Sequence, residues 1–242
     1  MRISVVVPVF NETDNVQTLI AEIHQVLQGL ESYEMIFVND GSIDDTADKL
    51  LAAMSSYPAL RVIQHQFSCG QSRAIRTGVE AAQFPWIATL DGDGQNDPAD
   101  IVNLLEYLRQ HAQEDLWMLA GHRYQRHDSG WRRFSSRFAN FVRQAILHDH
   151  TPDTGCGLKL FRREQFLSLP YFDHFHRFLP ALVQMAGGRV VSVKVSHRPR
   201  QFGRSKYGTF DRLTVGIVDI LGVIWLKHRH RLPIISEVKR GR

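Results

Sequence analysis

Two carboxylates, each followed by a glycine, are the sharpest chemical feature of this sequence. The segment reads Asp91-Gly92-Asp93-Gly94-Gln95 and follows the short apolar run 86–90. Paired carboxylates at a strand end can hold a hard divalent cation, which also takes oxygens from a substrate diphosphate. A plain Asp-Gly turn is the alternative interpretation. We predict that Asp91 and Asp93 bind Mg²⁺ or Mn²⁺.

A second polar turn, Asn39-Asp40-Gly41-Ser42, follows the apolar run 33–38. Each of the two turns stands at the carboxyl end of an expected strand. In parallel α/β sheets, ligands bind outside these strand ends. The first ~120 residues are therefore expected to form a nucleotide-binding α/β unit, although they contain no Gly-rich phosphate loop.

The elements that must position these turns follow from hydrophobic periodicity. Strands are expected at 3–7, 33–38, 60–65, 86–90, 117–120, 158–161 and 190–195. Helices are expected after Thr13 or Asp14, one of which should be the N-cap, at 44–54 and 72–82, after Asp97-Pro98, from Ser136, and around 181–185. Such alternation predicts an α/β fold with a mostly parallel sheet flanked by helices.

The carboxyl-terminal part of the chain is strongly basic. The net charge is +4, yet residues 198–242 carry 11 Lys and Arg against 3 Asp and Glu, which leaves 18 against 22 elsewhere. This asymmetry indicates a polyanion or an anionic membrane surface as the partner of the basic part.

A near-apolar stretch of 14 residues, 213–226, lies within this basic part. As a helix it would be about 21 Å long, shorter than the ~30 Å hydrocarbon core of a bilayer, so we expect no membrane span. The apolar residues expected on one stripe are Leu213, Ile217, Ile220, Leu221 and Ile224. A buried helix and an amphipathic helix lying on an anionic membrane both remain open.

Composition excludes several classes of protein. Hydrophobic residues make up 43% of the 242 residues, which excludes wholesale disorder. The two cysteines, Cys69 and Cys156, exclude a disulfide scaffold, and Cys156 is expected to serve packing. The N-terminus runs straight into the segment 3–7, with no charged lead followed by an apolar h-region and a cleavage site, so we expect no signal peptide.

Three segments in order resemble the family 2 glycosyltransferases: 5–12, 38–42 and 91–95. The segments 121–124 and 132–140 and the loop 197–207 narrow this resemblance to polyprenyl-phosphate glycosyltransferases of the dolichol-phosphate mannose synthase type. The resemblance covers roughly residues 3–208. It implies a GT-A catalytic domain over 1–208, followed over 209–242 by an amphipathic helix and a basic tail on the membrane surface.

The resemblance also implies site residues. Those expected to bind the nucleotide sugar are Pro8, Phe10, Glu12, Asn39, Asp40, Asp91, Gly92, Asp93 and Gln95. Those expected around the acceptor phosphate are Arg123, Arg132, Ser136, Arg200, Ser205 and Lys206. Catalysis is assigned to Asp91, Asp93, Arg123 and Arg200, with the metal on the two aspartates. Asn39 departs from the family pattern, in which Asp is usual.

The function implied is inverting transfer of a sugar from a UDP- or GDP-linked donor to a polyprenyl phosphate of the dolichyl or undecaprenyl type. A lipid phosphate is already an anion, so it can attack the anomeric carbon without a general base, and cations would align the two anions. The enzyme is expected at the cytoplasmic face of the membrane, bound peripherally or through a membrane partner protein. The residues leave the sugar unassigned.

Two other functions remain open at this stage. A soluble family 2 transferase with a saccharide hydroxyl acceptor would need a carboxylate base, for which Asp153 is the candidate. A nucleic-acid-binding module would need base-reading side chains among the basic residues, and Asp91 and Asp93 would repel its ligand, so we expect no nucleic-acid partner. His176 and Arg177 either meet the donor sugar or cap a helix.

Overall fold

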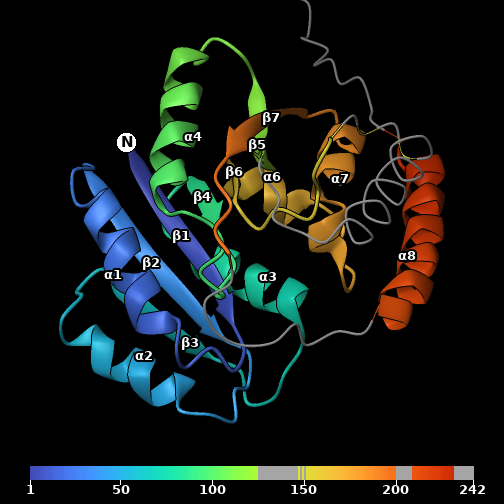
Figure 1. Cartoon of the computed structure of the whole chain (residues 1–242). Coiled ribbons are helices and arrows are strands. Elements are labelled where there is room, and N and C mark those ends of the chain that lie inside the picture. The colour runs from blue at the N-terminus through green and yellow to red at the C-terminus, as the bar shows by residue number, and fades with distance from the viewer. Residues whose placement is uncertain (125–146, 148, 150, 200–208, 232–242) are drawn as a thin grey trace, which may run out of the picture.

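A seven-stranded sheet with helices on both faces forms the body of the protein (Figure 1). The computed structural model describes residues 1–124, 147, 149, 151–199 and 209–231, with the side chains of 209–215 excepted. The strand order is β3-β2-β1-β4-β6-β5-β7.

The amino-terminal half alternates strands and helices without exception. Its elements are β1 (Arg2–Val9), α1 (Val16–Leu27), β2 (Ser32–Asn39), α2 (Thr46–Met54), β3 (Leu60–Gln64), α3 (Gln71–Ala81), β4 (Trp86–Thr89) and α4 (Ala99–Gln110). β1 pairs in parallel with β2 and with β4, and β2 pairs in parallel with β3. Because β1 is covered on both faces, every residue after Arg2 is buried and, apart from Ser4, apolar, so the strand shows no alternation.

One antiparallel strand interrupts the sheet in the second half. The elements there are β5 (Leu116–Arg123), β6 (Lys159–Arg162), α6 (Arg163–Ser168), η1 (Phe175–Arg177), α7 (Leu179–Met185), β7 (Arg189–Val195) and α8 (Thr209–Arg229). β6 runs antiparallel to β4 and β5, whereas β5 and β7 are parallel. The predicted mostly parallel sheet is thus confirmed, and β6 begins at the edge where β4 and β5 end.

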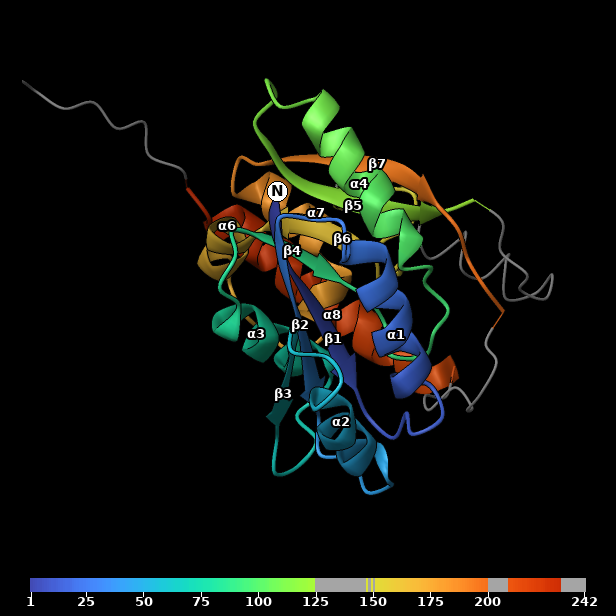
Figure 2. The same ribbon diagram turned by 90° about the vertical axis from the view of Figure 1, so that its left-hand side faces the viewer.

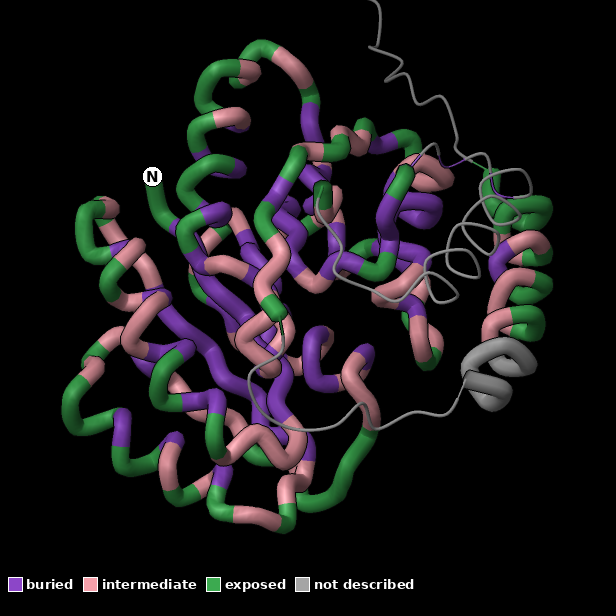
Figure 3. Tube along the Cα trace, in the orientation of Figure 1, coloured by how far each residue is buried: buried purple, intermediate pink, exposed green. Residues whose placement is uncertain are grey.

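Two apolar layers hold the helices on the sheet. One layer joins a face of β1 and β2 to α1, α2 and α4, and the other joins the opposite face to α3, α6, η1, α7 and α8. Figure 2 shows the helices on the two faces of the sheet, and Figure 3 shows the buried residues concentrated in the strands and on the inward sides of the helices. Packing on both faces therefore positions the strand ends at the edge where the polar turns lie.

The predicted cap of the first helix is wrong. α1 begins at Val16 after Asn15, whose side chain makes no cap hydrogen bond. The Asn15 amide instead donates to Glu12 Oε2 at 2.7 Å. The side chains of this turn are therefore used to shape the loop between β1 and α1 rather than to start the helix.

The described residues of the predicted apolar stripe of the carboxyl-terminal helix divide between the core and the surface. α8 has 21 residues, and Val223 is 2% exposed, with Ile220 and Ile224 partly buried against the core. Ile217 and Leu221, expected on the same stripe, are 53% and 61% exposed. α8 therefore has apolar residues on both its inward and its outward side, whereas the prediction placed the apolar residues on one side only. Within the described residues, no helix combines the length and apolarity needed to cross a bilayer. The helix expected from Ser136 lies outside them.

Candidate active site

The loop that carries the two aspartates lies directly against the end of β1. A Cβ on Gly92 would be 2.7 Å from Val9 Cγ1 and 3.0 Å from the Pro8 carbonyl oxygen. Gly94 has φ +71°, a conformation that glycine adopts without strain. Asp93 Oδ1 accepts a hydrogen bond from the Gln95 backbone at 3.1 Å. The predicted metal loop and the predicted nucleoside segment are therefore neighbours.

Asp91 is held on two sides. The Gln71 side-chain amide donates to Asp91 Oδ1 at 2.8 Å. From another direction the chain approaches so closely that a Cβ on Gly157 would lie 2.3 Å from Asp91 Cγ. The carboxylate position is thus set by contacts from two separate segments of the chain, which is the support that a metal ligand needs.

The electrostatics of Asp91 fit a divalent cation. Burial and the neighbouring charge of Asp93 raise the pKa of Asp91 to about 6, although Lys159 and Arg123 oppose the rise. Two close carboxylates in a poorly solvated cleft repel each other, and a bound cation would relieve this repulsion. Carboxylate oxygens are also the ligands that Mg²⁺ and Mn²⁺ prefer.

Asp40 anchors the loop that follows β3. Its Oδ1 accepts hydrogen bonds from His65 Nδ1 at 2.7 Å and from the Cys69 backbone at 2.9 Å, and its Oδ2 accepts from Ser68 Oγ and the Gly70 backbone, each at 2.8 Å. Burial alone would raise the pKa of Asp40, but these hydrogen bonds hold it below its usual range. Its contact with base or ribose remains a prediction.

The departure at Asn39 has a local explanation. Its Oδ1 accepts hydrogen bonds from the Ser42 backbone and hydroxyl, and its amide donates to Gln64 Oε1 at 2.9 Å. An aspartate could accept the first two bonds, but it has no donor for the Gln64 oxygen. Asn39 therefore ties β2 to β3 and shapes the turn before Ser42.

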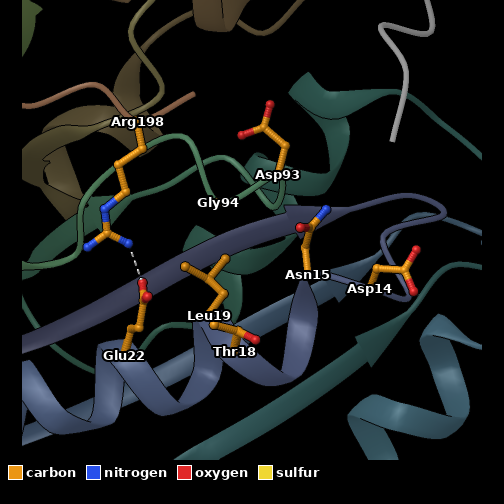
Figure 4. A pocket seen from close by; sticks show the side chains of 8 residues that line it. All are labelled: Asp14, Asn15, Thr18, Leu19, Glu22, Asp93, Gly94 and Arg198. Atoms are coloured by element: carbon orange, nitrogen blue, oxygen red, sulfur yellow. Dashed lines mark hydrogen bonds and ion pairs between the residues drawn. The ribbon is translucent and has the colours of Figure 1, made fainter. Parts of the chain in front are cut away.

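The predicted nucleoside segment joins two loops. The Glu12 backbone donates to Thr46 Oγ1 at 2.9 Å, and the Asn11 backbone donates to Ser42 Oγ at 2.9 Å. Phe10 and Glu12 are half-buried. Beside this segment lies a polar pocket that reaches the metal loop (Figure 4). Its lining residues are Asp14, Asn15, Thr18, Leu19, Glu22, Asp93, Gly94 and Arg198.

Arg198, which the sequence analysis did not single out, ties this pocket together. Its guanidinium reaches Glu22 at 2.8 Å and Asp97 at 2.9 Å, and its backbone donates to the Gln95 carbonyl at 2.9 Å. The segment that follows β7 is thereby fastened to the metal loop. A lone arginine in a basic segment carries no sequence feature that separates this role from a solvated charge.

Arg123 and Asp153 form a buried pair at the same edge. Arg123 Nε and Nη2 donate to the two Asp153 oxygens at 2.7 and 2.8 Å, and the side chains are 13% and 5% exposed. Burial alone would lower the pKa of Arg123, but the hydrogen bonds and charge of Asp153 raise it above its usual value. A carboxylate engaged in this way is a poor general base.

Lys159 is a buried cation that the sequence analysis missed. It is 4% exposed, and its ammonium group donates to the carbonyl oxygens of Thr154 and Cys156. Burial lowers the pKa of Lys159, and the charges of Cys156 and Asp91 oppose this change. The sequence signal for this buried lysine is its position inside the otherwise apolar run 158–161, which was expected to form a strand. Cys156 is buried, so its predicted packing role is confirmed.

His176 lies close to this edge but its predicted alternatives stay open. Its Nδ1 shares a hydrogen bond with Ser72 Oγ at 2.7 Å, and burial lowers the pKa of His176 well below its usual value, which keeps the imidazole neutral. The remaining predicted acceptor residues, namely Arg132, Ser136, Arg200, Ser205 and Lys206, lie outside the described part of the chain.

Solved structures share this fold. Glucosyl-3-phosphoglycerate synthase from Mycobacterium tuberculosis, in complex with Mn²⁺, uridine diphosphate and phosphoglyceric acid, has a TM-score of 0.70 at 18% identity, over 93% of this chain and 78% of that chain. A mannosyltransferase from Pyrobaculum calidifontis, in complex with GDP-Man and Mn²⁺, has a TM-score of 0.66 at 19% identity, over 96% of this chain and 66% of that chain. The predicted GT-A-type fold is confirmed.

Curated relatives are more similar in sequence. Dodecaprenyl-phosphate galacturonate synthase from Rhizobium johnstonii is 34% identical over 240 residues, which cover 96% of this chain and 69% of that protein. Undecaprenyl-phosphate 4-deoxy-4-formamido-L-arabinose transferase from Serratia proteamaculans is 32% identical, over 98% of this chain and 72% of that protein. Residues 4–168 match the family model described as Glycosyl transferase family 2. With its paired carboxylates at the edge of a GT-A-type sheet, the chain belongs to glycosyl transferase family 2.

Proposed function

We propose that this chain is a metal-dependent, inverting glycosyltransferase that moves a sugar from a nucleotide diphosphate donor to a polyprenyl phosphate. The observation that carries the proposal is the meeting of opposite charges at one sheet edge. Asp91 and Asp93 follow β4, and the buried cations Arg123 and Lys159 come from the adjoining ends of β5 and β6. The two curated relatives described above, whose names specify dodecaprenyl and undecaprenyl phosphate, support this acceptor.

The residues divide the task between donor and acceptor. The loop 91–95 and the segment 8–12 would hold the nucleoside diphosphate, and a divalent cation on Asp91 and Asp93 would stabilise the charge that develops on the leaving diphosphate. Arg123 would lie toward the acceptor phosphate. Its remaining guanidinium face is oriented by Asp153, because two parallel hydrogen bonds fix the plane of the group.

The acceptor is proposed to be a phosphate rather than a sugar hydroxyl because the available carboxylate is already engaged. A hydroxyl acceptor needs a base to remove its proton, and Asp153 has both oxygens bonded to Arg123. A phosphate acceptor needs no base. Its attack from the face opposite the leaving group would invert the configuration at the anomeric carbon.

The proposed membrane-facing surface is the outer face of α8, defined by Ile217, Val218, Leu221 and Trp225. These side chains are 53%, 67%, 61% and 60% exposed. Three exposed cations follow along the chain, namely Lys227, Arg229 and Arg231. Apolar side chains next to cations suit the interface of an anionic bilayer. Peripheral contact through this face, on the cytoplasmic side, would bring the site to its lipid acceptor.

A donor and acceptor screen tests the proposal. Purified protein is incubated with Mn²⁺ or Mg²⁺, a short polyprenyl phosphate, and UDP- or GDP-linked sugars that include a uronic acid and a formamido-arabinose, and released nucleoside diphosphate is measured. We expect release only with lipid phosphate and metal, and none from Asp91→Ala or Asp93→Ala. Transfer to a saccharide hydroxyl, with none to polyprenyl phosphate, would overturn the proposal.

A further inference from the structure

Three consecutive residues at the start of α3 each contact a different part of the candidate site. The Gly70 backbone donates to Asp40 Oδ2 at 2.8 Å, and the Gln71 side chain donates to Asp91 Oδ1 at 2.8 Å. Ser72 Oγ shares a hydrogen bond with His176 Nδ1 at 2.7 Å. The first turn of α3 therefore joins the turn after β2, the metal loop after β4, and η1.

We propose that Gln71 is a positioning residue that orients Asp91 for metal binding, and that Ser72 and His176 hold the turn from which Gln71 acts. This inference rests on the proposed function, because it assumes that Asp91 is a metal ligand.

The chemistry of the contact gives Gln71 a defined role. A carboxylate has acceptor oxygens only, so the glutamine must present its NH₂ group to Asp91. That hydrogen bond occupies Oδ1 and leaves Oδ2 as the freer oxygen. Hydrogen bonds of this kind fix the rotation of a metal-binding carboxylate and stabilise its charged form.

The turn itself is anchored so that Gln71 cannot drift. α3 packs so tightly on the sheet that a Cβ on Gly78 would lie 2.4 Å from Val6 Cγ1. Ser72 is 1% exposed, and its partner His176 is kept neutral by burial. Gly70, at the N-cap position with φ +88°, lets the chain turn from Asp40 into the helix. Both ends of the turn are thus fixed.

The test measures Mn²⁺ binding directly, by electron paramagnetic resonance or calorimetry, with Mn²⁺ alone as the probe. Gln71→Leu keeps the side-chain size but removes the donor, and we expect the Kd for Mn²⁺ to rise about 10- to 100-fold. Ser72→Ala keeps Gln71 and loosens its turn, so a smaller rise is expected. In turnover assays, the KM for Mn²⁺ should rise in Gln71→Leu while kcat at saturating Mn²⁺ recovers.

The matched control is Gln110→Leu, which removes an amide-to-carboxylate contact with Glu106 on the surface of α4. Its Mn²⁺ affinity should equal that of the wild type. A Gln71→Leu protein that binds Mn²⁺ as tightly as the wild type overturns this inference alone. A wild-type protein that binds no Mn²⁺ overturns the metal site of the proposed function, and this inference with it.

Discussion

Arg123 and Asp153 face each other across the sheet edge with two parallel hydrogen bonds, of 2.7 and 2.8 Å, between nearly buried side chains. Removal of either partner of such a pair destabilises the fold, because the other partner is left as an unpaired buried charge. The two hydrogen bonds also set the plane of the Arg123 guanidinium. The contribution of Asp153 to stability and its role in catalysis can therefore be tested with different variants.

Removal of one partner should be costly. We expect Asp153→Ala to lower the free energy of unfolding by about 3–5 kcal/mol, because Arg123 would remain charged and without its partner. Urea unfolding measures this change. The control is Asp115→Ala, whose partner Arg162 lies 3.3 Å away on the surface with side chains 76% and 37% exposed. Asp115→Ala should lower the free energy of unfolding by less than about 1 kcal/mol.

A second substitution of Asp153 distinguishes a phosphate acceptor from a hydroxyl acceptor. Asp153→Asn keeps the shape of the side chain but cannot act as a general base. With a phosphate acceptor, the variant should keep the pH dependence of kcat seen in the wild type, at a reduced rate. Loss of the acidic limb of the pH profile would instead assign the base role to Asp153 and favour a hydroxyl acceptor.

Gly157 should be required for metal binding. In Gly157→Ala the new Cβ would overlap the Asp91 carboxylate, because its ideal position lies 2.3 Å from Asp91 Cγ. We expect the displaced carboxylate to weaken Mn²⁺ binding by about tenfold or more, measured by calorimetry. Gly29→Ala is the control, since a Cβ there meets nothing within 4 Å. Equal Mn²⁺ affinity in both variants would contradict the assignment of Asp91 as a ligand.

The raised pKa of Asp91 predicts a pH-dependent metal affinity. Burial and the charge of Asp93 place this pKa at about 6 in the metal-free protein. Below that pH the proton competes with the cation, so the Mn²⁺ affinity should fall about tenfold per pH unit. Titrations between pH 5 and pH 8 test this. A flat affinity across that range would show that Asp91 does not bind the metal.

The same pKa predicts how stability changes with pH. The unfolded chain loses the Asp91 proton near the ordinary value of 3.8, whereas the folded chain retains it to about 6. The metal-free fold therefore loses stability as pH rises between these values, by roughly 3 kcal/mol in total. In EDTA, Asp91→Asn should be more stable than the wild type at pH 7.5 and equally stable near pH 3.5. An equal difference at both pH values would refute this linkage.

The outer face of α8 should govern membrane binding. We expect the double variant Leu221→Glu with Trp225→Glu to lose flotation with anionic vesicles, while its free energy of unfolding stays close to that of the wild type because both side chains are exposed. The control is Leu51→Glu, which changes a 58% exposed leucine of α2, on the opposite side of the protein (Figure 1). Unchanged flotation of the double variant would assign membrane contact to another surface or to a partner protein.

Local sequence patterns predicted the strands of the sheet, most of the helices and the place of the two acids Asp91 and Asp93. Apolar runs such as 3–7 and 33–38 predicted buried strands because a strand covered on both faces has no polar side. Asp91 and Asp93 could be placed at a strand end because their turn directly follows the apolar run 86–90. The order of the segments then predicted the family.

Only the tertiary structure decided which groups face each other at that edge. Asp91 is approached by Gln71, Gly157 and Lys159, and Arg123 is paired with Asp153. Each of these residues is at least 20 positions away in the sequence from the group that it approaches. The proximity of Gly157 and Lys159 depends on the antiparallel insertion of β6 between β4 and β5, a topology that hydrophobic periodicity does not encode. The orientation of α8 was hidden likewise, because both of its sides are apolar and only packing selects the inward one.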